Sequence, residues 1–70
     1  MSHKQMDDKA KLKVLIDHWI EHNMEHAREF TTWAGKAEQP EVRRHIEEAA
    51  RQMEKANDRL LAALERLEEV

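Results

Sequence analysis

The spacing of apolar residues constrains this chain more than any other feature. Apolar side chains recur every three or four residues from Leu12 to Leu67, with a break between Gly35 and Pro40. This period indicates amphipathic helices, because residues three and four apart lie on one face of a helix. The chain has one glycine, one proline and 39% charged residues, a composition typical of long helices with few turns. The sequence therefore predicts an all-α fold.

Two helices and one turn account for almost the whole chain. The expected segments are a flexible arm (1–6) and a helical hairpin (7–70) made of a first helix (8–36), a turn (36–39) and a second helix (40–69). Asp7 and Asp8 suit the N-terminal cap of the first helix. Pro40 suits the first position of the second helix, where its missing N–H is not needed.

Each predicted helix carries a wide apolar stripe. The first comprises Leu12, Leu15, Ile16, Trp19, Ile20, Asn23, His26, Ala27, Phe30, Trp33, Ala34 and Ala37. The second is a heptad stripe, Val42, Ile46, Ala49, Met53, Ala56, Leu60, Ala63 and Leu67, widened by Ala50, Asn57, Leu61 and Leu64. Two long helices joined by a short turn predict an antiparallel helical hairpin.

A single hairpin of this kind would leave much of both stripes in water. The chain has only 70 residues and no cysteine, so neither a large core nor a disulfide can stabilise it. Domains as small as this are commonly stabilised by oligomerisation. We therefore expect a homodimer that closes a four-helix bundle. The alternative is a monomer that presents its apolar face to a different protein partner.

Composition also excludes several classes of function. The net charge of −3 is small and mixed in sign, unlike the basic surface of a nucleic-acid-binding protein. No apolar run is long enough to span a membrane, and no secretory signal is evident, so we expect a cytoplasmic protein. The only hydroxyl side chains, Ser2, Thr31 and Thr32, lie in no recognisable catalytic motif. The sequence predicts a protein without enzymatic activity.

Three histidines four residues apart, His18, His22 and His26, are the main candidate for a functional site. Histidines at positions i and i+4 of a helix can present both imidazoles to one metal ion. His26 falls within the apolar stripe, His22 at its edge and His18 on its flank, at about 100° per residue. This pattern predicts His22 and His26 as ligands and His18 as an accessory ligand. Glu25 or Glu29 would orient the imidazoles.

Neutral imidazole ligands favour zinc, nickel, cobalt or copper over magnesium or calcium. A di-iron centre is disfavoured, because the glutamates that follow the histidines lie away from the apolar stripe and the second helix offers no inward carboxylate. The function predicted from these residues is a small metal-binding or metal-sensing module.

Other interpretations of the same residues remain open. Asn23 and His26 both interrupt the apolar stripe, and a buried polar pair can set the register of a structural or adaptor dimer. The histidines could also be ordinary solvated side chains. Because histidine titrates near neutral pH, a dimer that responds to pH is a further alternative.

One set of residues in the first helix forms a more specific pattern: Leu12 to Leu15, His18 to Asn23, Glu25 to Ala27, Phe30, Trp33 and Ala34. Through these residues the chain resembles an uncharacterised family of small helical-hairpin domains from archaea and anaerobic bacteria. In that family the hairpin often follows a histidine-rich arm, in contexts that imply the handling of nickel, cobalt or zinc. The resemblance implies functional positions at His18, His22, Asn23, Glu25 and His26. This chain departs from the family in its arm, which holds only His3.

Overall fold

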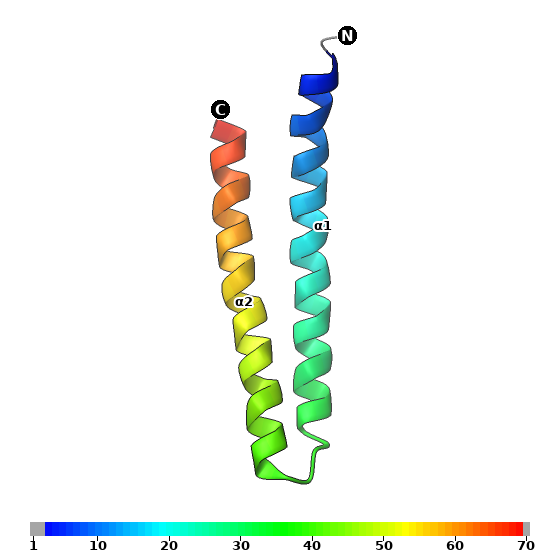
Figure 1. Ribbon diagram of the computed structural model, residues 1–70, viewed down its shortest axis with the longest axis vertical. Helices are drawn as coiled ribbons and strands as arrows, with labels where there is room; N and C mark the ends of the chain where they lie inside the picture. The colour runs from blue at the N-terminus through cyan, green and yellow to red at the C-terminus, as the bar shows by residue number, and fades with distance from the viewer. Residues whose placement is uncertain (1–2, 70) are drawn as a thin grey trace.

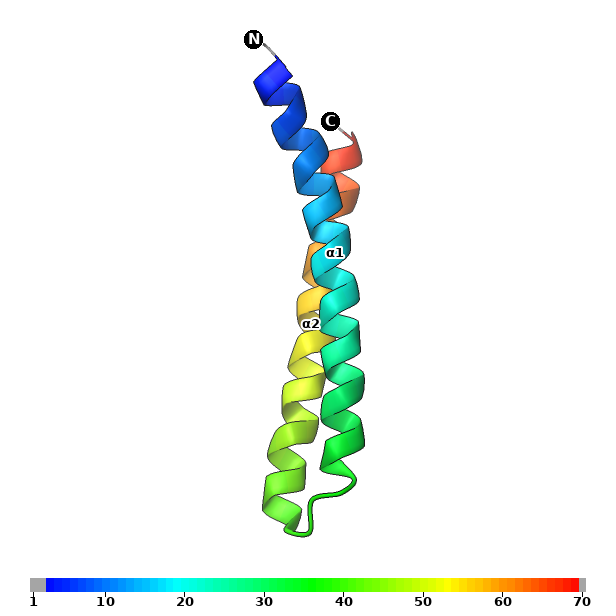
Figure 2. The same ribbon diagram turned by 90° about the vertical axis from the view of Figure 1, so that its right-hand side faces the viewer.

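Two long helices, packed side by side and antiparallel, make up the structure (Figure 1). The computed structural model describes the backbone of residues 3–69 and the side chains of residues 8–69. Helix α1 spans His3–Ala34 and helix α2 spans Pro40–Glu69. The two helices cross at a shallow angle (Figure 2), and the N-terminal end of α1 projects beyond the end of α2 (Figure 1). The predicted all-α hairpin is therefore confirmed.

The helix boundaries at the first helix differ from the predicted ones. Helix α1 begins at His3, five residues before the expected start, so the helix extends into the segment that was expected to be an arm. Met1 and Ser2 lie outside the described residues. Helix α1 ends at Ala34, after which the N–H groups of Lys36 and Ala37 bond to carbonyls three residues back. This tighter last turn satisfies carbonyl groups that the end of an α-helix leaves unpaired.

Short-range contacts organise the start of α2. The Arg43 N–H donates to the carbonyl of Gln39, which places Gln39 at the N-terminal cap with Pro40 as the first helical residue. The Arg43 guanidinium reaches back across the turn and donates to the carbonyl of Ala37 at 2.9 Å. Glu41 lies in the first turn, where its charge complements the positive end of the helix.

The contact between the helices follows one heptad on each. From Ile16 onward, the buried and half-buried residues of α1 are Ile16, Ile20, Asn23, Ala27, Phe30 and Ala34. On α2 the corresponding residues are Ile46, Ala50, Met53, Asn57, Leu60, Leu64 and Leu67, and Glu47 is also half-buried. Only part of the predicted apolar stripe of α2 packs against α1, because Val42, Ala49, Ala56 and Ala63 are exposed. In a two-helix hairpin each helix packs against a single neighbour, so only one side of its wide apolar stripe is covered.

Burial within the single chain is slight. The only apolar side chains classed as buried among those described are Ile16, Ala27, Ala34 and Ala50. The molecule measures 57 × 18 × 12 Å, and its radius of gyration of 16.4 Å exceeds the value of about 11 Å expected for a compact domain of this length. Over the described residues, neither helix has an apolar stretch sufficient to cross a membrane.

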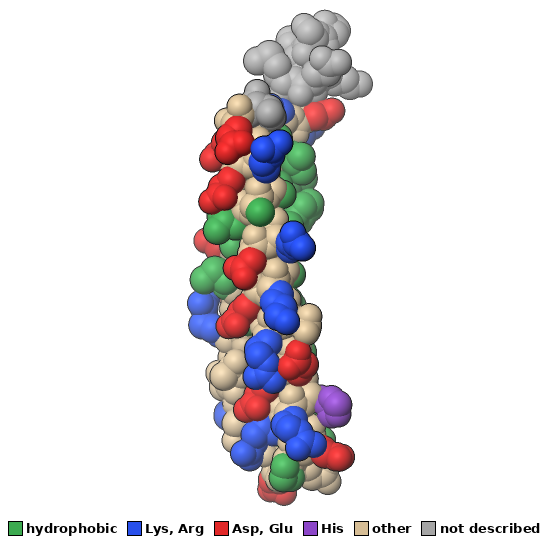
Figure 3. Space-filling view, turned by 90° about the vertical axis from the view of Figure 1, so that its left-hand side faces the viewer, with side chains coloured by type: hydrophobic (Ala, Val, Ile, Leu, Met, Phe, Trp, Pro, Cys, Tyr) green, Lys and Arg blue, Asp and Glu red, His purple; other side chains and the backbone are tan. Residues whose placement is uncertain are grey.

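The side of the hairpin formed by α2 is covered with charge of both signs (Figure 3). Glu48 is exposed and accepts hydrogen bonds from the Gln52 amide at 2.8 Å and from the Arg51 guanidinium at 2.8 and 3.0 Å. These hydrogen bonds, with that from Gln52 contributing most, and the positive charge of Arg51 lower the pKa of the Glu48 carboxyl below its usual value of 4.5. Such pairs keep this side solvated and contribute little to folding.

Candidate metal centre

The side chains of His18, His22 and His26 follow one another along α1. The ring centroids of His18 and His22 are 4.9 Å apart, and those of His22 and His26 are 5.5 Å apart. Neighbouring rings are tilted by 55° and 52°. Four residues are slightly more than one helical turn, so the rings stack along the helix with a slow drift around it. We call these three side chains the histidine ladder.

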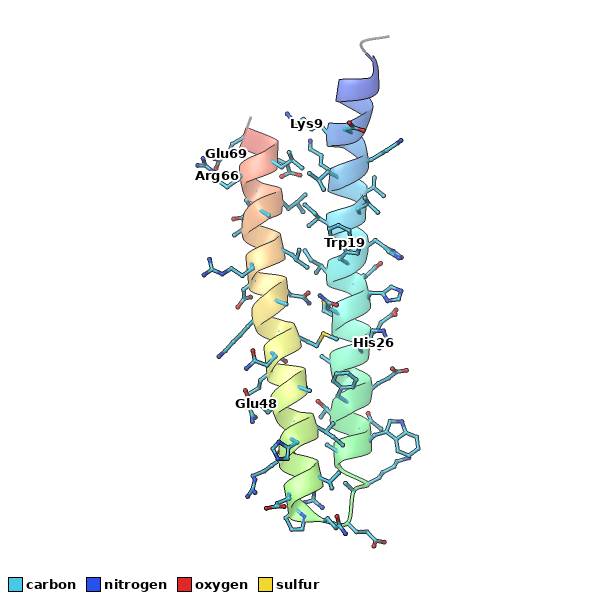
Figure 4. All side chains as sticks on the ribbon, viewed as in Figure 1. Lys9, Trp19, His26, Glu48, Arg66 and Glu69 are labelled. Atoms are coloured by element: carbon cyan, nitrogen blue, oxygen red, sulfur yellow. The ribbon has the colours of Figure 1, made fainter. Side chains whose placement is uncertain are left out.

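The histidine ladder is open to solvent. All three residues are exposed, and His26 projects outward from α1 rather than toward α2 (Figure 4). The Nδ1 atom of His26 lies 3.4 Å from a carboxylate oxygen of Glu29, one of the two glutamates expected to orient the imidazoles. A carboxylate at Nδ1 favours the tautomer that leaves Nε2 free to bind a metal.

The spacing of His22 and His26 is compatible with chelation of one ion. Metal–nitrogen bonds of about 2.0–2.1 Å place two ligand nitrogens of a tetrahedral site about 3.3 Å apart. Ring centroids at 5.5 Å allow nitrogens on the facing edges to approach this spacing after small side-chain rotations. Among the residues that the structure describes, no three histidine, cysteine or acidic side chains converge in a way that could hold a metal ion. An ion at His22 and His26 would take its other ligands from water or from another molecule.

Asn23 lies between the two candidate ligands in sequence but faces α2. Its side-chain amide donates to the side-chain oxygen of Asn57 at 3.0 Å, and the Asn57 amide donates to the carbonyl of Ile20 at 3.2 Å. Within one chain, the polar layer therefore consists of Asn23 and Asn57, and His26 lies outside it. Asn57 occupies a heptad position on α2, and this signal in the sequence could have identified it as the partner of Asn23.

The histidine ladder borders an uncovered apolar surface. An open groove beside it is lined by His18, Trp19, His22, Asn23, His26 and Leu60. A second groove near the turn is lined by Glu29, Phe30, Trp33, His45, Ile46 and Ala49. His26 of the first groove and Trp33 of the second are seven residues apart on α1, so the two grooves lie along one side of the hairpin. Helical periodicity extends this side to further exposed residues. We call it the open apolar face, formed by Leu12, Leu15, Trp19 and Trp33 of α1 and by Ala49, Ala56 and Ala63 of α2.

Comparison with known protein families finds a match over most of the hairpin. A family model described as a domain of unknown function, DUF8180, matches residues 12–67. The chain belongs to the DUF8180 family. The DUF8180 match covers most of α1 and nearly all of α2, and it includes the histidine ladder and the Asn23–Asn57 pair. A search of curated proteins and a search of solved structures found no match.

Proposed function

We propose that this hairpin is a small non-enzymatic module that binds or senses a transition metal through His22 and His26. The observation that carries the proposal is the position of the two imidazoles one turn apart on the exposed side of α1, with ring centroids 5.5 Å apart. His18, whose ring is 4.9 Å from that of His22, is placed to act as an accessory ligand. Since all three rings are exposed, an ion can reach them without unfolding the helix.

The donor set indicates the class of metal. Imidazole nitrogen suits zinc, nickel and cobalt, and the resemblance to hairpin domains from contexts of nickel, cobalt or zinc handling supports the same choice. The carboxylate of Glu29 beside His26 Nδ1 supplies the type of outer partner that metal-binding histidines commonly have. No thiolate competes for the ion, because the chain contains no cysteine.

Thermal unfolding of metal-free, untagged protein tests the proposal. We expect zinc, nickel or cobalt, added separately, to raise the midpoint of unfolding. An ion that binds only the folded state stabilises it by about 2.7 kcal/mol at 100 times its dissociation constant. The His22→Ala/His26→Ala double variant should lose this response.

His45→Ala is the matched control, because His45 is an exposed histidine on α2 outside the histidine ladder. This variant should keep the full response to metal. If the His22→Ala/His26→Ala variant binds metal as tightly as the wild type, the assignment of these ligands is wrong.

The exposed aromatic residues favour a second candidate function, that of a structural or adaptor dimer without metal. Trp19 and Trp33 are 42% and 62% exposed, and large aromatic side chains are enriched at protein interfaces. In this case the Asn23–Asn57 pair serves as the polar layer that sets the register. Chelators and added metals would then leave the melting curve unchanged.

A further inference from the structure

We infer that the open apolar face is covered by a second copy of this chain, bound across a two-fold axis that passes between His22 and His26. The axis runs perpendicular to the helices and lies within the interface, so α1 packs antiparallel to the partner's α1 and α2 antiparallel to the partner's α2. Four imidazoles then surround one point. This arrangement deepens the proposed function and, for the metal itself, rests on it.

The surface area of the chain supports a partner of about its own size. The accessible surface is 5874 Å², which exceeds by about 1,300 Å² the area expected for a folded monomer of this mass. If both copies hid such an area, the interface would total about 2,600 Å², within the range of obligate homodimers. The apolar residues of this face also repeat along the full length of the hairpin, so an equally long partner is needed to cover them.

Helix α1 carries a second heptad besides the one that packs on α2. Its positions alternate by three and four residues: Leu12, Leu15, Trp19, His22, His26, Glu29 and Trp33. From Leu15 to Trp33 these positions are symmetric about the midpoint of His22 and His26. An antiparallel pair of α1 helices centred there sets Leu15 against Trp33 of the partner subunit and His22 against His26 of the partner subunit. A surface that pairs with itself in this way satisfies the requirement of a two-fold interface.

The exposed alanines of α2 are arranged symmetrically about the same height along the hairpin. The Asn23–Asn57 hydrogen bond sets residues 23 and 57 at one height, and in an antiparallel hairpin residue 24 then lies level with Ala56. Ala56 is the middle of the three exposed alanines of the open apolar face, which recur every seven residues. One axis across both helices therefore pairs Ala56 with Ala56 of the partner subunit, and the small side chains let the α2 helices approach closely.

The dimer completes the metal site that one chain leaves open. Two imidazoles from each chain give the four nitrogen ligands of a tetrahedral ion, and each Glu29 remains beside its own His26. The ion would lie on the two-fold axis, so we expect one ion for every two chains. Metal binding would thus stabilise the dimer specifically.

Disulfide cross-linking tests this arrangement without relying on metal, because the native chain has no cysteine. A mixture of Leu15→Cys and Trp33→Cys chains should form cross-linked dimers on mild oxidation. Leu15→Cys alone should not, since its two copies would lie about 27 Å apart along the helices, at 1.5 Å per residue. Met24→Cys is the matched control: Met24 has similar exposure but lines the grooves of the opposite side. The Met24→Cys chain should cross-link neither with Leu15→Cys nor with Trp33→Cys.

Two results would overturn the inference. Cross-linking of Leu15→Cys with itself would require parallel α1 helices or an axis level with Leu15, and either excludes an axis between His22 and His26. A monomer in sedimentation equilibrium, together with no cross-link between the two variants, would show that no second copy covers the open apolar face.

Zinc titration separates failure of the inference from failure of the proposed function. Saturation at one ion per two chains supports the four-imidazole site. Binding of one ion per chain without cross-linking keeps the metal function and overturns the dimeric site. The expected cross-link without any effect of metal keeps the antiparallel pairing and overturns the metal function.

Discussion

Asn23 and Asn57 form the only hydrogen bond between side chains of α1 and α2 among the described residues. We expect Asn23→Leu to lower the free energy of unfolding by about 1 kcal/mol, because Asn57 loses its donor. Asn57→Leu should cost a similar amount, since Asn23 then loses its acceptor. The double variant should be at least as stable as the wild type, because two leucines restore an apolar contact between α1 and α2.

A double-mutant cycle measured by chemical denaturation at one protein concentration checks this prediction. Because the two single costs of about 1 kcal/mol vanish in the double variant, the two substitutions should show a coupling of about 2 kcal/mol. Additive effects would mean that the asparagines act independently. In the second candidate function, where this pair sets the register of the dimer, we also expect the double variant to populate more than one oligomeric state in sedimentation.

At the scale of the element, the end of α1 does not depend on its glycine. Gly35 has no positive φ, and its N–H donates to the carbonyl of Thr31, as in a continuing helix. A Cβ added there would lie 3.4 Å from the carbonyl oxygen of Thr32, an ordinary contact. We therefore expect Gly35→Ala to raise the free energy of unfolding by about 0.4–1 kcal/mol, because alanine restricts the unfolded chain.

Chemical denaturation measures the effect of Gly35→Ala, and Ala62→Gly calibrates it. Ala62 is exposed in the interior of α2, where glycine should cost about 0.5–1 kcal/mol. A loss of stability in Gly35→Ala would imply that the turn needs a backbone conformation that alanine rarely adopts.

For the whole molecule, the inferred dimer would couple folding to assembly through the open apolar face. The unfolding temperature of the wild type should rise with protein concentration, because binding of a second copy stabilises the folded state by mass action. We expect Leu15→Glu to remove this dependence and to lower the unfolding temperature, since Leu15 is a 43% exposed residue of that face. Met24→Glu is the control, because Met24 is 47% exposed on the opposite side. Equal effects of the two substitutions would contradict a specific interface.

The helical hairpin could be predicted from sequence because its signals are local. The period of the apolar residues, Pro40 at a helix start and the break at Gly35 each act within a few residues. Helix α1 begins at His3, although residues 3–7 show no apolar period, so the period does not mark where this helix starts. The one-turn spacing of His18, His22 and His26 follows in the same way from helix geometry.

Sequence by itself thus determined two amphipathic helices, their antiparallel order and a row of histidines on the first. Only the tertiary structure decided which side of each stripe is packed. It paired Asn23 with Asn57, placed Ala50 in the contact and left Ala49, Ala56 and Ala63 exposed. The physical reason is that each helix carries two overlapping heptads of similar apolar character, and local spacing cannot rank them. The choice depends on how two complete surfaces fit together over the length of the hairpin.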